Sequence, residues 1–330
     1  MSWTPHTGGW TTIGGGWYNT ASGNYAAVGG GISNTASYSY TAVSGGYNNT
    51  ADDQCATVGG GRHNTASASD ATVCGGYDNV ASGIHSVVGG GVDNVASGIR
   101  ATIPGGESNV AASSWSFAAG RQAKAYQYGC FVWGDSTDAY ITCNDPDRWV
   151  ARASGGVYFH TNAGLSSGMY LAAGGSSWNA VSSRALKDNL ALVDTGQLLE
   201  RLARIDIGTW NYRSQDPAIR HIGPMAEDFN GLVDGLGGQG ADHINTLDAD
   251  GVALAAIQGL YDENQALKAK NAAQQEQIND LAARLSALEQ AGGRPAQGRS
   301  ALSLIWPLAV GLVVAGGGTA AARRRPGGGR

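Results

Sequence analysis

Apolar, glycine and asparagine positions recur every fifteen residues through the first third of the chain. The apolar residues in this register are Ile13, Val28, Val43, Val58, Val73, Val88 and Ile103, each followed two positions later by a glycine. The asparagines are Asn19, Asn34, Asn49, Asn64, Asn79, Asn94 and Asn109, each followed two positions later by an alanine. A fixed period without insertions is typical of a solenoid, in which each repeat forms one coil and stacks on the coil before it.

One repeat reads Ala-x-Val-x-Gly-Gly-x-x-Asn-x-Ala-Ser and predicts a short strand, a glycine turn and a second short strand over residues 1–120. Glycine supplies the positive φ that the corners need. We expect the asparagine at its fixed corner to hydrogen-bond to its copy in the next coil. Because the interior residues are small, one coil has a narrow bore, and several chains packed side by side would bury more surface than one. The variable positions, such as Trp17, Arg62 and Tyr77, share no chemistry, so the sequence assigns no ligand to the solenoid.

The period ends near residue 120, but β character continues to residue 181. Residues 131–133, 149–153 and 156–159 predict strands separated by Gly, Asp and Ser turns. We therefore expect a β-rich neck over residues 121–181.

From residue 182 the apolar spacing becomes helical. Leucines and an isoleucine recur at three- and four-residue spacing, and Asp194 and Thr195 are candidate helix caps. A strand over 207–212 follows. Residues 182–254 are therefore predicted to form a compact α+β domain.

Residues 255–290 carry a heptad pattern. Its a positions are Ile257, Asn264, Asn271, Ile278 and Leu285, and its d positions are Leu260, Leu267, Gln274, Leu281 and Leu288. Alternating spacings of three and four predict a coiled coil, in which the polar seam residues select register and strand number. Packing of the helix against its own chain is the alternative. Residues 291–300 are predicted to be a linker.

Residues 301–322 carry no charge and are followed by a basic tail over 323–330. About twenty uncharged residues match the thickness of a bilayer core, so a membrane helix is predicted. A flexible tail and a cleaved sorting signal are the alternatives. The tail arginines outnumber Arg294 and Arg299, which predicts a cytoplasmic C-terminus and a fibre at the cell surface. The N-terminus lacks the pattern of a Sec signal peptide, so the export route stays open.

Charge and cysteine content narrow the function classes further. The net charge is −5 and no basic stripe runs along the repeats, so nucleic-acid binding is not expected. Cys55, Cys74, Cys130 and Cys143 lack metal-site spacing, and we predict small buried side chains rather than disulfides or metal ligands. The histidines show no ligand spacing, so no metal or cofactor is expected. We expect His221, with Glu227 and Asp228 nearby, to order its domain rather than to form a second site.

Several short segments carry a family resemblance through their order along the chain. They are Gly174–Trp178, Ser182–Asn189, Thr209–Tyr212, His221–Ala226 and Asp248–Leu254. Together, over about residues 115–290, they resemble the intramolecular chaperone auto-processing domain of phage endosialidases, tailspikes and fibres, which is serine-peptidase family 74. The repeats before them resemble the head repeats of trimeric autotransporter adhesins.

The family resemblance implies a self-cleavage site. In that family the chain cuts itself just before the serine of a Ser-Asp-x-x-x-Lys motif. Counting back from Lys187 reaches Ser182, so the implied scissile bond is Val181–Ser182 and the implied catalytic pair is Ser182 and Lys187. Ser183 stands where the family usually has Asp, which makes it an alternative nucleophile.

A serine–lysine pair reacts only if the lysine amine is in a suitable environment. The lysine can take the serine proton only when its amine is neutral, which requires burial away from carboxylates. Lys187 lies among Ala185, Leu186 and Leu190 in the sequence, and we expect Ser182 in the turn before a helix, at its N-cap. An ordinary capping serine with a surface lysine is the alternative interpretation.

These patterns predict a mainly β homotrimeric fibre. We expect a β-solenoid to precede an α+β chaperone domain, a parallel coiled coil and a membrane helix. The family resemblance implies that the chain is a single-turnover self-cleaving serine endopeptidase. One alternative is a membrane-tethered protein whose N-terminal part is released as an effector. Another is a trimeric scaffold that is never cut.

Overall fold

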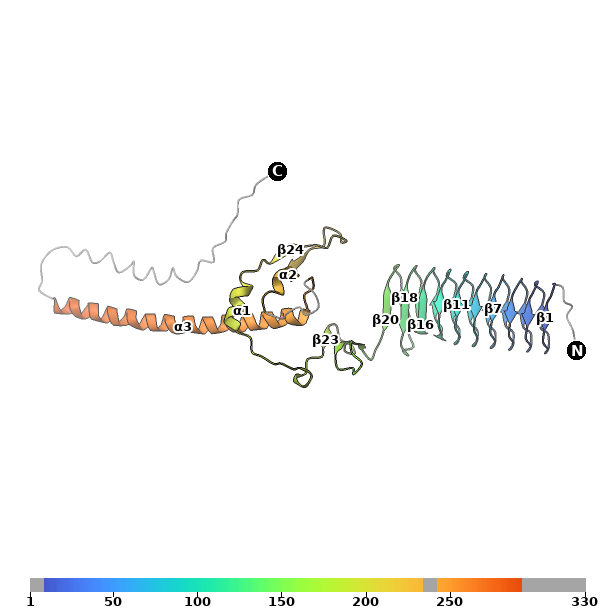
Figure 1. Cartoon of the computed structure of the whole chain (residues 1–330), viewed down its shortest axis with the longest axis horizontal. Helices are drawn as coiled ribbons and strands as arrows, with labels where there is room; N and C mark the ends of the chain where they lie inside the picture. The colour runs from blue at the N-terminus through green and yellow to red at the C-terminus, as the bar shows by residue number, and fades with distance from the viewer. Residues whose placement is uncertain (1–8, 234–241, 293–330) are drawn as a thin grey trace, which may run out of the picture. The chain divides into compact units, whose positions relative to one another are not determined.

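The computed structural model describes residues 9–233 and 242–292. The chain divides into two compact units, Met1–Asn189 and Leu190–Arg330, each with its own hydrophobic core. Figure 1 shows the first unit as a stack of β coils that leads into a small sheet. The predicted mainly β fold with an N-terminal solenoid is confirmed.

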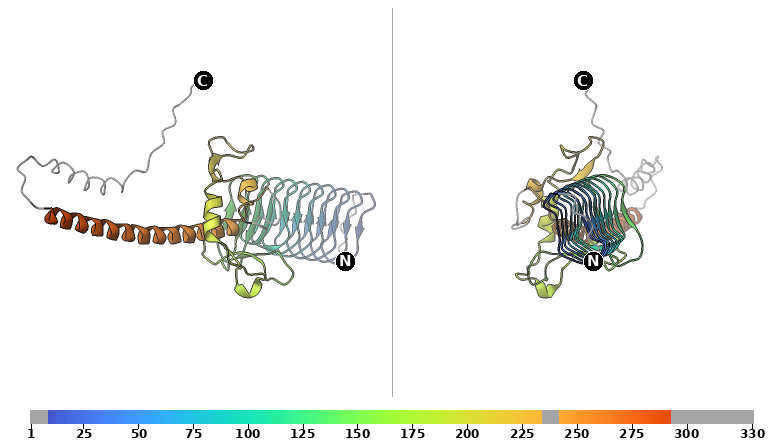
Figure 2. Two further views of the ribbon diagram at one scale, coloured as in Figure 1. Left: turned by 60° about the vertical axis from the view of Figure 1, so that its left-hand side comes forward. Right: turned by 90° about the vertical axis from the view of Figure 1, so that its right-hand side faces the viewer.

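Successive coils contribute short strands to two parallel sheets. The first sheet contains β1 (Thr12–Ile13), β3 (Ala27–Val28), β5 (Ala42–Val43), β7 (Thr57–Val58), β9 (Thr72–Val73), β11 (Val87–Val88), β13 (Thr102–Ile103), β14 (Gly106–Glu107), β16 (Phe117–Arg121), β18 (Phe131–Gly134) and β20 (Trp149–Arg152). The second contains β2 (Thr20–Ala21), β4 (Thr35–Ala36), β6 (Thr50–Ala51), β8 (Thr65–Ala66), β10 (Val80–Ala81), β12 (Val95–Ala96), β15 (Val110–Ala111), β17 (Ala123–Ala125) and β19 (Ile141–Cys143). The right-hand view of Figure 2 looks along this stack, and the coils lie one behind another.

The solenoid core consists of columns of small residues that point inward. The valine of each repeat, from Val28 to Val88, is at most 1% exposed, and an alanine column faces it from the second sheet. Parallel pairing sets each residue beside its copy fifteen positions later, as in Val43 beside Val58. Burial of these columns favours the stack because apolar area leaves water along its whole length.

The asparagine ladder predicted from the repeat is confirmed. The side chain of Asn49 donates to Oδ1 of Asn34 at 3.1 Å and to the carbonyl oxygens of Gly45 and Gly61, both at 2.9 Å. Its own Oδ1 accepts from the backbone N–H of Asn64 at 3.0 Å. Each asparagine thus satisfies buried backbone groups of its own coil and of its neighbours, which an apolar residue cannot do.

Glycine is required at one corner of each coil. Gly76 has φ +94°, and a Cβ there would lie 2.2 Å from the carbonyl oxygen of Gly91. Gly75 beside it has room, since the nearest atom to its Cβ would be 3.9 Å away. The corner therefore combines a left-handed backbone with close contact between coils.

The solenoid extends beyond its predicted end at residue 120. Phe117 pairs with Phe131, and Phe131 with Trp149, so parallel stacking continues to Arg152 within the predicted neck. The repeat length changes to fourteen and then to eighteen residues in these coils, as the pairs show. Since Val132 and Cys143 keep the inward columns filled, changes in corner length hide the period in the sequence without ending the fold.

A disulfide joins Cys130 to Cys143 inside the coil that contains β18 and β19. The prediction of unpaired buried cysteines was therefore wrong for this pair. Cys130 continues the inward column of Ser116 and Cys143 that of Ala125, so the coil brings their Cα atoms to 6.2 Å. Cys55 is half-buried and Cys74 is exposed, and both are free thiols.

The rest of the predicted neck is a separate antiparallel sheet of β21 (Val157–His160), β22 (Gly168–Leu171) and β23 (Trp178–Ala180). Asp135 ties the last coil to the chain that enters this sheet. Its carboxylate accepts from Arg152 Nε at 2.7 Å and from the backbone N–H of Ser154 at 2.8 Å.

The second unit, Leu190–Arg330, combines helices with a small β-hairpin. It contains α1 (Thr195–Leu202), the antiparallel hairpin of β24 (Gly208–Trp210) and β25 (His221–Gly223), α2 (Ala226–Phe229) and α3 (Thr246–Ala291). Its core is formed by Leu198, Phe229, Leu232 and Val252. Asp194 caps α1 by accepting from the N–H of Gln197 at 3.0 Å, as one of the two candidate caps predicted.

The long helix α3 includes the heptad segment and begins at Thr246, before the predicted boundary at 255. Its early residues Val252 and Ala256 are buried within the unit, which extends the helix into the domain. The heptad leucines beyond them are exposed, Leu267 at 56% and Leu281 at 61%. Packing against the same chain therefore covers only the start of the helix.

In the part of the chain that the structure describes, no helix is long and apolar enough to cross a membrane. The predicted membrane helix 301–322, the tail 323–330 and the linker from residue 293 lie outside the described residues.

Candidate functional site

The segment that leads from β23 into the next helix holds the residues singled out by the sequence. The backbone N–H of Val181 donates to the carbonyl oxygen of Gly168 at 3.4 Å, so Val181 continues the edge of β23. Ser182 follows directly. The next element is η1 (Arg184–Leu186), a single turn of 3-10 helix.

Ser183 caps this turn. It has φ −69° and ψ 138°, and its Oγ accepts from the backbone N–H of Ala185 at 3.3 Å. Its carbonyl oxygen accepts from the N–H of Leu186 at 3.1 Å, which closes the turn. The prediction that Ser182 caps a regular helix was therefore wrong by one residue, because the helix is a single tight turn that begins later.

The structure brings Ser182 and Lys187 together. Nζ of Lys187 donates a hydrogen bond to Oγ of Ser182 at 2.6 Å. Lys187 lies just past η1 with an extended backbone, φ −125° and ψ 136°. The turn reverses the chain, and the long lysine side chain then reaches back to the residue that precedes the cap.

The pair is open to solvent in the single chain. Every residue from 181 to 194 is exposed, including Leu186 at 54% and Leu190 at 61%. The expectation that nearby apolar residues bury Lys187 is thus wrong for one chain. The physical reason is that one helical turn is too short to fold these side chains onto the core of the unit.

Another lysine is buried by the solenoid. Lys124 is 8% exposed, and burial lowers the pKa of its amine. Its Nζ donates to the carbonyl oxygen of Ser108 at 2.6 Å and lies 5.0 Å from the ring centre of Tyr140. Its amine contacts a backbone carbonyl and an aromatic ring, so Lys124 connects neighbouring coils.

His221 lies in the hairpin of the second unit. Its Nε2 is 2.9 Å from Oε1 of Gln215, and its ring packs 4.8 Å from that of Trp210. Glu227 and Asp228 are exposed in the first turn of α2. Negative side chains at this end of a helix interact favourably with the helix dipole. Among the described residues, no group of three or more acidic, histidine or cysteine side chains is placed to hold a metal ion.

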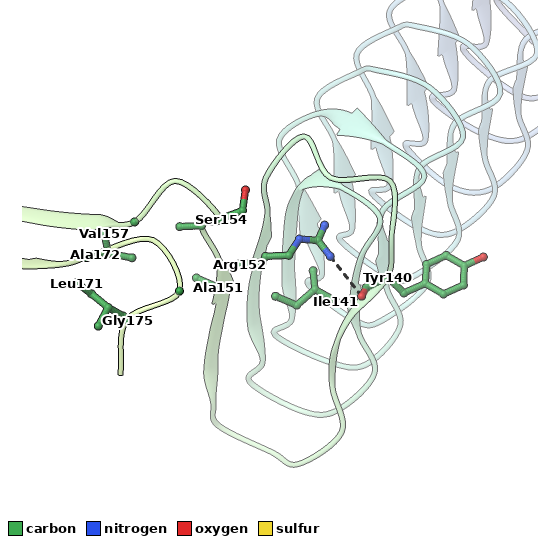
Figure 3. Close-up of a pocket in the computed structure, with 12 residues that line it drawn as sticks. Tyr140, Ile141, Ala151, Arg152, Ser154, Val157, Leu171, Ala172 and Gly175 are labelled. Carbon is green, nitrogen blue, oxygen red and sulfur yellow. Dashed lines mark hydrogen bonds between the residues drawn. The ribbon is translucent and has the colours of Figure 1, made fainter. Parts of the chain in front are cut away.

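A shallow pocket of about 410 Å³ lies between the last coil and the three-stranded sheet (Figure 3). Arg152 forms part of its wall. Its guanidinium donates to the carbonyl oxygens of Thr137 and Ala139 at 3.0 and 2.9 Å, in addition to Asp135. These bonds fix the guanidinium in the last coil, and small or apolar residues form most of the remaining lining, so we assign this pocket no chemistry.

Sequence reasoning missed the cap at Ser183, the Asp135–Arg152 ion pair and the disulfide. A serine directly before a helical turn is a visible signal for the cap. The other two contacts join residues of coils with unequal lengths, and the sequence carries no period there that reveals them.

Comparison with known protein families places the site at the start of a domain. Residues 182–237 match the family described as chaperone of endosialidase, peptidase S74. This family is linked to self-cleaving peptidase activity. No curated protein matches the chain. The match begins at Ser182, the residue that accepts the hydrogen bond from Lys187. Residues 182–237 are therefore similar to the chaperone-of-endosialidase family, and this stretch directly follows the β-solenoid and the small antiparallel sheet.

Proposed function

We propose that this chain is the subunit of a homotrimeric, tailspike-like fibre whose chaperone domain cuts the chain between Val181 and Ser182. The single observation that carries the proposal is the 2.6 Å hydrogen bond between Lys187 and Ser182 at the start of the matched domain. The solenoid would be the lasting fibre, and the part after residue 181 would be its folding device.

The proposed reaction begins when Nζ of Lys187, in its neutral form, takes the proton of Ser182 Oγ. The oxygen attacks the carbonyl carbon of Val181. The peptide bond then breaks, the lysine ammonium returns the proton to the departing nitrogen of Ser182, and an ester joins Val181 to Oγ. Water hydrolyses the ester to a carboxylate on Val181 and a free amine and hydroxyl on Ser182.

Tethering supplies much of the rate enhancement of this step. The nucleophile is covalently attached to the bond that it cuts, and well-oriented intramolecular reactions reach effective concentrations of about 10⁵–10⁸ M. No substrate pocket is needed. The reaction consumes its own bond, so each chain turns over once.

Exposure of the pair suggests how cutting is timed. A solvated ammonium holds its proton, whereas removal from water favours the neutral amine. We propose that partner chains cover Ser182, Lys187 and the exposed leucines around them, so that the pair becomes active only in the assembled trimer. Release of the folding device then leaves a fibre that cannot retrace its assembly.

The exposed heptad face of α3 supports a parallel coiled coil as the trimer contact. Leu267 and Leu281 occupy d positions, where leucine packs into the holes of facing helices. Replacing both with lysine should leave the chain monomeric and uncut. The matched control is Ala269→Lys with Ala283→Lys, at positions that face away from the seam. Sedimentation and denaturing electrophoresis measure both outcomes, and cleavage of the monomeric leucine variant would overturn the link between assembly and cutting.

The direct test of cutting compares the intact chain with Ser182→Ala. The wild type should yield fragments of residues 1–181 and 182–330, whose masses identify the bond. Ser182→Ala should stay in one piece while it still forms trimers. Ser176→Ala, an exposed serine of the same segment, is the matched control and should be cut normally. A wild-type trimer that stays whole would refute the proposed self-cleavage and leave a scaffold.

The uncharged segment 301–322 supports a second part of the proposal, attachment of the C-terminal product to a membrane. The arginines that follow favour a cytoplasmic tail and a fibre at the cell surface. Vesicle flotation of the full chain and of a chain ending at residue 300 tests this. Equal flotation of the two would refute membrane attachment.

A further inference from the structure

We infer that Ser183 is a positioning residue for cleavage at Ser182, and not a second nucleophile. The inference rests on the proposed function. It is carried by two hydrogen bonds of adjacent serines that have different partners: Ser183 Oγ accepts from the N–H of Ala185, and Ser182 Oγ accepts from Nζ of Lys187.

The stability of η1 depends on its cap. A turn of three residues has almost no cooperative stability of its own, because nucleation costs more than one backbone bond returns. Its first N–H groups have no partner inside the turn. The Oγ of Ser183 supplies one at 3.3 Å, and its carbonyl oxygen closes the turn onto Leu186. The cap therefore holds the turn in place.

The turn η1 fixes the backbone of Lys187. The backbone N–H of Lys187 donates to the carbonyl oxygen of Arg184 at 3.2 Å, so the lysine backbone is fixed by the same turn. With the backbone held there, Nζ of Lys187 reaches Oγ of Ser182, five residues earlier in the chain. If the turn opens, the lysine moves away from the hydroxyl. Ser183 thus acts on the reaction through Lys187.

The hydrogen bonds of the two serines argue against Ser183 as the attacking group. The Lys187 side chain donates to Ser182 Oγ, whereas Ser183 Oγ accepts from the backbone N–H of Ala185. A hydroxyl without a base nearby is a poor nucleophile. Attack by Ser183 would also cut a different bond, Ser182–Ser183, and give a fragment that begins at residue 183.

Aspartate is as good an N-cap as serine, since its carboxylate accepts the same backbone hydrogen bond. Asp at position 183 should therefore support the turn but cannot replace a nucleophilic hydroxyl. This difference separates the two roles of the residue. Ser183→Asp is the decisive variant.

The test follows cleavage over time in full-length chains made by cell-free synthesis. Ser183→Ala should form the same trimer and cut at the same bond, but about fivefold more slowly, the effect of losing a typical cap. Ser183→Asp and Ser183→Asn should cut at close to the wild-type rate. Ser176→Ala controls for loss of an exposed hydroxyl. Native electrophoresis checks that the yield of trimer is equal, so that a slower rate reflects the cleavage step.

Three results would overturn the inference. They are cleavage of Ser183→Ala at the wild-type rate, a Ser183→Asp variant no faster than Ser183→Ala, and a fragment of Ser182→Ala that begins at Ser183. Each leaves the proposed function intact if the wild type is cut at Val181–Ser182. A wild-type trimer that stays uncut overturns the proposed function, and this inference with it.

Discussion

Lys187 donates a hydrogen bond from Nζ to Oγ of Ser182 at 2.6 Å, although five residues separate them and both side chains are exposed in the single chain. One capped turn of 3-10 helix makes this contact. The two side chains thus meet within one chain, where both remain open to solvent.

The proposed role of Lys187 as a base predicts that a positive charge alone at this position does not support cleavage. Lys187→Arg keeps a cation and a donor near Ser182, but a guanidinium does not become neutral in proteins. We expect cleavage to slow by about 10²–10⁴-fold, the usual contribution of a general base, and Lys187→Met to behave alike. The fraction of chain cut over time measures this. Lys268→Arg on α3 is the control, and normal cutting of Lys187→Arg would exclude the base role.

The asparagine ladder predicts that replacing Asn49 destabilises the solenoid more than replacing the adjacent Asn48. Asn49→Ala removes the acceptor for the buried N–H of Asn64 and the donor to two glycine carbonyls, and should cost about 3 kcal/mol. Asn48 is exposed and bonds to His63, and its backbone is left-handed with φ +55°, so Asn48→Ala should cost only about 1 kcal/mol, mainly from backbone strain. Hydrogen exchange of amides in the neighbouring coils measures both. Equal protection in the two variants would contradict a structural role for the ladder.

The disulfide predicts that reducing agents loosen the end of the solenoid. Closing a loop between Cys130 and Cys143 should contribute about 3 kcal/mol by restricting the unfolded chain. Cys130→Ala with Cys143→Ala should raise exchange of the amides of β18 and β19. The control pair, Cys55→Ala with Cys74→Ala, removes only free thiols and should leave these amides protected. Identical exchange with and without reductant would show that the bond does not stabilise this coil.

The Asp135 carboxylate predicts acid sensitivity of the last coil. Hydrogen bonds from Ser154, and then from the Arg152 guanidinium, hold the pKa of Asp135 well below its usual range. The unfolded chain therefore takes up the proton first. The stabilisation is complete above the pKa of an unfolded aspartate, about 3.9, and is lost progressively as the pH falls below it.

Asp135→Asn should thus weaken the last coil at pH 7 and flatten the pH dependence of its amide protection between pH 5 and 2. Asp52→Asn, an exposed aspartate of an earlier coil, should leave both unchanged. Parallel pH profiles of the wild type and Asp135→Asn would show that this carboxylate does not stabilise the last coil.

The sequence predicts the parts of the fold whose contacts join residues at a regular spacing, and it does not predict the contacts that follow no period. The coils and the ladder at Asn34 and Asn49 follow from the fifteen-residue period, and the exposed part of α3 follows from the heptad pattern, whereas the start of α3 at Thr246 does not. The candidate pair of Ser182 and Lys187 came from a family resemblance, and their contact then depended on a turn whose cap the sequence analysis placed one residue early. The exposure of Leu186 and Leu190 was not predictable, because local apolar neighbours do not reveal whether a short turn reaches a core.

The amino-acid sequence by itself determined the β-solenoid, since identical residues stacked in parallel register satisfy the same columns and hydrogen bonds in every coil. Only the tertiary structure decided that the stack continues to Arg152, that Cys130 bonds to Cys143, and that Ser183 caps the turn that carries Lys187 to Ser182. These features join residues whose separation along the chain follows no repeat. Their distances are set by how the corners and turns fold in space.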